Sequence, residues 1–132
     1  MKRLNISSGA PWESIVGYSR AVRVGPHVHV SGTTAVNGEG ALVSADDPYG
    51  QTVYILSKIE KALHEAGAEL KDVVRTRIYV TDVTDWDEVG RAHGEVFGQI
   101  RPAATLVEVS SLLEPEMLVE IEVDAFCGEV TL

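Results

Sequence analysis

The chain contains one cysteine, Cys127, so it cannot form an internal disulfide, and no Cys/His spacing typical of a zinc site surrounds it. No apolar run approaches the roughly 20 residues of a membrane-spanning helix. The N-terminal residues include no apolar stretch of the kind that secretory signals carry. We therefore expect a cytoplasmic protein that needs no metal or organic cofactor and has no membrane partner.

Basic residues are also scarce. Eleven Lys and Arg face twenty Asp and Glu, which gives a net charge of −9 and argues against a nucleic-acid partner. The glycines at 37–40 do not join a strand to a helix with the spacing of a phosphate-binding loop. At 132 residues and 45% hydrophobic composition, the chain is long enough for one domain over 1–132 with a substantial core.

The pattern of apolar residues predicts six strands and two helices. Alternation of side chains favours strands at 2–6, 19–24, 27–32, 73–81, 101–109 and 118–126, and punctuation by Gly and Pro favours a loop at 8–13 and a hairpin or flap at 33–43. The first helix begins at Pro48 with Asp47 as its N-cap, and Gly67 is a natural stop. The second follows a capping-box pattern at Thr84 and Asp87 and ends at Gly98.

The first helix is expected to bury Val53, Leu56, Ile59, Leu63 and Ala66. The second is expected to carry Trp86, Val89, His93, Val96 and Phe97 along one side. Its glycines at 90, 94 and 98 indicate either close packing or a weak helix. This order of elements predicts an α+β fold, a two-layer structure in which both helices lie on one face of a single sheet. A ferredoxin-like topology is the alternative.

Two helices can cover only one face of such a sheet. The other face is expected to collect His27, His29, Ser31, Arg75, Arg77, Tyr79, Glu120 and Glu122, with Leu118 and Phe126 beside them. Cross-strand ion pairs on a solvated face would explain the charges but would leave large apolar groups in water. A closed homo-oligomer that buries these faces explains both.

Several segments in this order resemble the Rid (reactive intermediate deaminase) family, also called YjgF and once labelled endoribonuclease L-PSP. They are Val-Ser-Gly at 30–32, Arg-Thr-Arg-Ile-Tyr-Val-Thr-Asp at 75–82, Arg-Pro-Ala at 101–103, Val-Glu-Val at 107–109 and Val-Glu-Ile-Glu at 119–122. The resemblance covers nearly the whole chain. It implies a chorismate-mutase-like fold, a homotrimer, and clefts between subunits that bind a small metabolite.

Members of the RidA type hydrolyse enamines and imines to 2-keto acids and ammonia. The resemblance places Glu120 at the glutamate that positions the attacking water, Ser31 and Gly32 in the wall of the cleft, and Trp12 at an aromatic of the same wall. Ala104 stands where RidA-type members carry the arginine that binds the substrate carboxylate, and Gly90 replaces a pocket asparagine. The resemblance therefore implies a subgroup that lacks the carboxylate-binding arginine.

The residues themselves leave alternatives open. Trp12 could be a packing anchor, and Glu120 could be an ion-pair partner of Arg75 or Arg77. His27 and His29, two apart on one strand face, have no third ligand nearby in sequence, so a metal site is disfavoured. For the whole protein, imine hydrolysis stands beside non-catalytic binding of a small metabolite, and a ribonuclease is disfavoured because no basic patch interleaves with aromatics.

Overall fold

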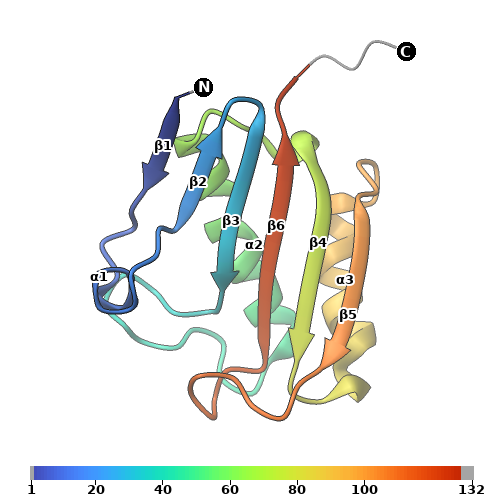
Figure 1. Ribbon diagram of the computed structural model, residues 1–132. Coiled ribbons are helices and arrows are strands. Elements are labelled where there is room, and N and C mark those ends of the chain that lie inside the picture. Colours follow the sequence, from blue (N-terminus) through green and yellow to red (C-terminus); the bar gives the residue numbers. More distant parts are fainter. Residues whose placement is uncertain (1, 129–132) are drawn as a thin grey trace.

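The computed structural model describes residues 2–128, and these residues form one mixed sheet with helices on one face (Figure 1). The six strands lie in the order β1-β2-β3-β6-β4-β5. Their bounds are β1 Arg3–Ile6, β2 Ala21–Val24, β3 His27–Thr33, β4 Val73–Val80, β5 Ala103–Glu108 and β6 Val119–Phe126. The predicted α+β class is thus confirmed, and the first strand is an edge strand.

Two long helices lie behind the sheet: α2 spans Pro48–Glu65 and α3 spans Trp86–Phe97 (Figure 1). Short 3-10 helices, η1 at Leu70–Asp72 and η2 at Val83–Asp85, precede β4 and α3. Within residues 2–128, no helix is both long and apolar enough to cross a lipid bilayer.

The connections explain how the last strand reaches the centre of the sheet. β3 and β4 both pair with β6 antiparallel, so they run parallel to each other with β6 between them, and α2 joins them as a split βαβ unit. β4 and β5 pair in parallel through α3. From β3 onward the order is β-α-β-α-β-β, whereas a ferredoxin-like fold reads β-α-β-β-α-β, so that alternative was wrong.

The core lies between the sheet and the two long helices. Alternate residues of β6 are buried there, and they meet the apolar side of α2, including Ile55, Ile59 and Leu63. The opposite sheet face carries the predicted polar residues, since β3, β4 and β6 alternate between buried positions and half-buried or exposed ones. Leu118 was expected beside them, but it packs against the core. The uncovered face is therefore confirmed.

The N-terminal segment differs from the prediction. Residues 8–13 are not all loop, because a third helix, α1, spans Pro11–Val16. Proline occupies its first turn, and Gly17 ends it with a φ of 91°, a left-handed conformation that glycine adopts without strain. Six residues are too few to show a helical period, so the pattern could not reveal it.

A bulge shifts the start of β4. The prediction placed Val74 with Thr76, Ile78 and Val80, but the pairing with β6 slips between Val73 and Arg75. Val73 is consequently buried, and Val74 is 52% exposed. An extra residue at a bulge moves the side chains that precede it to the opposite face of the sheet.

The helices also differ at particular residues. The capping box at Thr84 and Asp87 was wrong: Asp82 accepts the Thr84 amide within η2, and α3 starts only at Trp86. Val53 and Trp86 were predicted to lie on the apolar sides of the two long helices, but both side chains are exposed. The Asp47 cap and the end at Gly98 are confirmed.

The glycines of α3 do not mark a tight helix contact. A Cβ added to Gly94 would meet nothing, and one added to Gly90 would reach only Trp86 at 4.0 Å. Only at Gly98 would a Cβ crowd a neighbour, the Gly94 carbonyl 2.7 Å away. Close packing is therefore not the reason for the repeat.

Candidate active site

Glu120 lies on the uncovered face of β6, with its carboxylate against the backbone of Gly32 in β3. A Cβ added to Gly32 would overlap Glu120 Oε2 and stand 3.0 Å from Cδ. The absence of a side chain at position 32 is what lets the carboxylate lie there. Two of the residues that the sequence assigns to one cleft are thus in contact.

The Glu120 carboxyl group has a raised pKa. Burial raises it first and the charge of Glu122 adds to this, while the positive charge of Arg20 lowers it. Within residues 2–128 no group donates a hydrogen bond to this carboxylate, so its oxygens can accept from water or a ligand. A carboxylate with a raised pKa is a stronger base than an ordinary one.

The neighbouring acids of β6 are already paired, in contrast to Glu120. Arg77 Nη1 lies 2.9 Å from Asp124 Oδ2, and His29 Nδ1 lies 2.7 Å from Asp124 Oδ1. The Tyr79 hydroxyl donates to Glu122. Across the described part of the chain, neither Arg75 nor Arg77 forms an ion pair with Glu120, so its role as their partner was wrong.

Ser31 and Gly32 end β3 beside this site. The Ser31 hydroxyl donates to the Ser19 carbonyl at 2.6 Å, which fixes the chain there and occupies its proton. The Gly32 carbonyl accepts from Arg20 Nη2 at 2.9 Å. The pairing of β3 with β6 is interrupted between Val30 and Thr33, so this is a bulged stretch next to Glu120.

Trp12 lies on α1, which joins the end of β1 to the start of β2, the same end of the sheet at which β3 reaches Gly32 (Figure 1). Its side chain is 45% exposed, so it is not a buried packing anchor. Glu13 beside it is buried and accepts hydrogen bonds from both Ser7 and Ser8, which lowers its pKa against the effect of burial. Glu13 therefore fixes α1 in place.

Ala104 is not near Glu120 within one chain. It lies on the edge strand β5 and pairs with Thr76, which faces the helices, whereas Glu120 pairs with Tyr79 on the other face. Two strand spacings and about three residues separate them, or roughly 14 Å. A cleft that contains both positions requires a second chain.

No local pattern in the sequence pointed to two cations near this site, Arg20 and Lys58. Lys58 Nζ on α2 donates to the Thr34 and Val36 carbonyls at 2.9 and 2.7 Å, and burial together with the charge of Arg20 lowers its pKa to about 8. Arg20 lies over the Tyr18 ring, with 5.7 Å between the guanidinium carbon and the ring centroid. Both cations reach the site only through non-local contacts.

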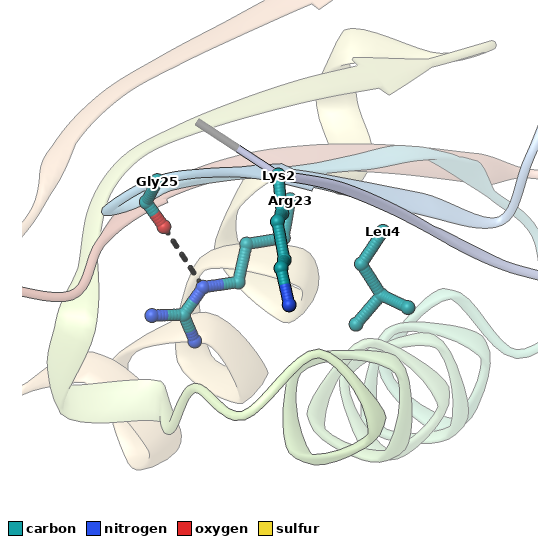
Figure 2. Close-up of a pocket in the computed structure, with 4 residues that line it drawn as sticks. All are labelled: Lys2, Leu4, Arg23 and Gly25. Atoms are coloured by element: carbon teal, nitrogen blue, oxygen red, sulfur yellow. Dashed lines mark hydrogen bonds between the residues drawn. The ribbon is translucent and has the colours of Figure 1, made fainter.

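A separate pocket of roughly 230 Å³ lies at the other end of the sheet (Figure 2). Lys2, Leu4, Arg23 and Gly25 line it. Arg23 donates through Nε to the Gly25 carbonyl and through Nη1 to the Ala66 carbonyl, both at 2.9 Å, so it caps the end of α2. Within residues 2–128 no three His, Cys, Asp or Glu side chains gather as metal ligands.

Comparisons with known proteins place this chain and its fold among relatives. The model of the family described as endoribonuclease L-PSP matches residues 8–127. The crystal structure of Rv2704 from Mycobacterium tuberculosis, a member of the YjgF/YER057c/UK114 family, is 54% identical with a TM-score of 0.87, over 95% of this chain and 99% of that one.

Two curated relatives are also similar over most of their length. The uncharacterized protein SCO2049 of Streptomyces coelicolor is 41% identical over 95% of this chain and 92% of its own. The 3-aminoacrylate deaminase RutC of Acinetobacter baylyi is 31% identical over 91% of this chain and 94% of its own.

Proposed function

This chain belongs to the endoribonuclease L-PSP family, which includes the YjgF and Rid proteins, and we propose that it hydrolyses reactive imines or enamines at clefts between subunits. The observation that carries the proposal is the Glu120 carboxylate, half-buried against Gly32, with a raised pKa and no hydrogen-bond donor among the described residues. A relative named as a 3-aminoacrylate deaminase, whose substrate is an enamine, supports the same chemistry.

The reaction asks little of the protein. An enamine takes up a proton on carbon to become an iminium ion, which is already electrophilic. Water adds to the iminium carbon while the Glu120 carboxylate accepts one of its protons, which gives a neutral carbinolamine. The protonated Glu120 returns that proton to the nitrogen. The C–N bond then breaks and ammonia leaves, while the hydroxyl loses its proton to the Glu120 carboxylate and becomes the carbonyl of the product. Positioning one water and one base can supply much of the rate enhancement.

The working unit is a closed homotrimer in this proposal. Exposed apolar residues gather on and after α1, where Trp12, Ile15, Val16 and Tyr18 are all more than a third exposed, and Val107 is exposed on β5. Patches of this kind mark interaction sites. Contact between the β5 edge of one subunit and the α1 end of the next would bring Ala104 to the Glu120 cleft. Light scattering should report about three times 14.2 kDa.

Ala104 places the chain, in this proposal, in a subgroup that does not bind substrate as RidA-type members do. A buried guanidinium that holds a carboxylate at two points contributes roughly 2–5 kcal/mol. The side chain at 104 is a methyl group on an exposed edge strand, so it cannot do this. The substrates are therefore either uncharged imines or 2-imino acids held by another cation.

Non-catalytic binding of a small metabolite is the second candidate, and the methyl group at 104 favours it. The same cleft and the same oligomer would serve, with Trp12, Ser31 and Gly32 as its wall. Turnover distinguishes the two candidates, because a binding protein would leave the rate of imine decay unchanged.

The test is hydrolysis of 2-aminoacrylate, generated in place by a serine or threonine dehydratase, with the wild type beside Glu120→Ala and Ala104→Arg. Wild-type activity that disappears in Glu120→Ala would support the hydrolase. Activity only in Ala104→Arg would mean that the cleft is intact but the natural substrate differs. Silence of all three in an intact oligomer would favour the binding protein.

A further inference from the structure

Arg20 is the charged group that the catalytic proposal has not used, and it stands beside Glu120. Arg20 directly precedes β2; its backbone N–H donates to the Ile6 carbonyl, and its own carbonyl accepts from the Ser31 amide. Its Nη2 donates to the Gly32 carbonyl, the same residue against which the Glu120 carboxylate lies. Arg20 and Glu120 therefore both lie against Gly32.

The guanidinium is only partly satisfied by the protein. Nε is buried without a hydrogen-bond partner among the described residues, and Nη1, which has none either, does not share that full burial. No carboxylate of residues 2–128 lies within 4.0 Å of it as a salt-bridge partner. Its positive charge nevertheless acts to lower the pKa of both Glu13 and Glu120. An arginine with unused donors at a cleft is suited to an anionic ligand.

The nearby carboxylates do not compete strongly for it. Glu13 already accepts from Ser7 and Ser8, so it is satisfied without Arg20. The pKa of Glu120 stays raised despite Arg20, because burial and the charge of Glu122 act against it. Lys58 adds a second positive charge close by, and it donates two of its three ammonium protons to the Thr34 and Val36 carbonyls.

We propose that Arg20 binds the carboxylate of 2-imino acid substrates, in place of the guanidinium that position 104 lacks. In a 2-imino acid the imine carbon is bonded directly to the carboxylate carbon. A carboxylate held by Arg20 Nη1 would direct the electrophilic carbon, one bond away, toward Glu120, because both side chains lie against Gly32. This inference rests on the proposed site at Glu120 and narrows its substrates to anionic imines.

The experiment measures binding and turnover separately. Pyruvate, the product from 2-iminopropanoate, is titrated against the intact protein by NMR, with acetone as the analogue in which methyl replaces carboxylate. One charge-assisted hydrogen bond corresponds to roughly a 10- to 100-fold change in Kd. We expect Arg20→Gln to raise the pyruvate Kd by that factor and to leave acetone unchanged. Arg3→Gln, the same change on the exposed edge strand, is the matched control.

The outcomes separate this inference from the proposed hydrolysis. Pyruvate affinity that is equal in the wild type and Arg20→Gln overturns the role of Arg20, even if 2-aminoacrylate is hydrolysed. Pyruvate binding that depends on Arg20, without turnover of 2-aminoacrylate, supports the carboxylate-binding role of Arg20 and refutes the proposed hydrolysis. Should Arg20→Gln fail to fold, the wild type alone still tests the inference, because pyruvate that binds no more tightly than acetone overturns it.

Discussion

Replacement of Gly32 by alanine should move the Glu120 carboxylate without deleting any functional group. The added Cβ would overlap Oε2 and stand 3.0 Å from Cδ, whereas ordinary contacts begin near 3.4 Å. Relief of both contacts requires the carboxylate oxygen to shift by about 1 Å, and a misplacement of about 1 Å can lower a rate about 100-fold. We therefore expect a 10- to 100-fold lower kcat in Gly32→Ala, by the same order of estimate.

Stability should change much less than activity. The neighbour that must yield is the end of a flexible side chain, and Gly32 has no left-handed φ that alanine would strain. Overpacking of a rigid core usually costs about 1–3 kcal/mol, and the free energy of unfolding should fall here by no more than the lower end of that range, about 1 kcal/mol. Gly38→Ala is the matched control, because a Cβ there meets nothing within 4 Å. Full activity in Gly32→Ala would refute the placement of Glu120 in the catalytic step.

Three further changes test the energetics. The raised pKa of Glu120 means that the folded state binds this proton more tightly than the unfolded state, so the free energy of unfolding falls as pH rises from the unfolded-state pKa to the folded-state pKa. Glu120→Gln has no such proton, so urea unfolding should show its free energy of unfolding rising relative to that of the wild type across this pH window. A difference that does not change with pH would contradict this. Ile121→Ala, fully buried, should cost about 2–5 kcal/mol, while Val53→Ala, 45% exposed on α2 and away from the proposed subunit contact, should cost less than about 0.5 kcal/mol. Asp47→Ala removes the acceptor for the Gly50 amide and should lower the free energy of unfolding by about 1 kcal/mol. An unchanged urea midpoint of unfolding would show that this N-cap does not stabilise α2.

The sequence predicted the elements whose signals are local and repeated. The helix at Pro48 has a cap, a proline and a long apolar period, and the strand at Val119 alternates without interruption. The helix at Pro11 is shorter than two helical turns and leaves no period to detect. The bulge before Arg75 depends on how β4 pairs with β6, which no single strand can reveal.

The candidate site divides in the same way. Glu120, Ser31 and Gly32 were predicted together through a family resemblance, and the fold brings Glu120 and Gly32 into contact. Arg20 was missed because its role comes from a contact with Gly32, twelve residues away, and from the charge of Glu120, which lies on another strand. Such contacts follow from the fold and leave no local pattern.

Glu120 as the base of imine hydrolysis is the central claim, and the decay of 2-aminoacrylate tests it most directly. The measurement is the rate of ammonia and pyruvate release above the uncatalysed rate, for the wild type and for Glu120→Gln at equal oligomer concentration. We predict acceleration by the wild type and a loss of at least about 100-fold in Glu120→Gln, the scale of general base catalysis. Equal acceleration by both proteins would contradict the account.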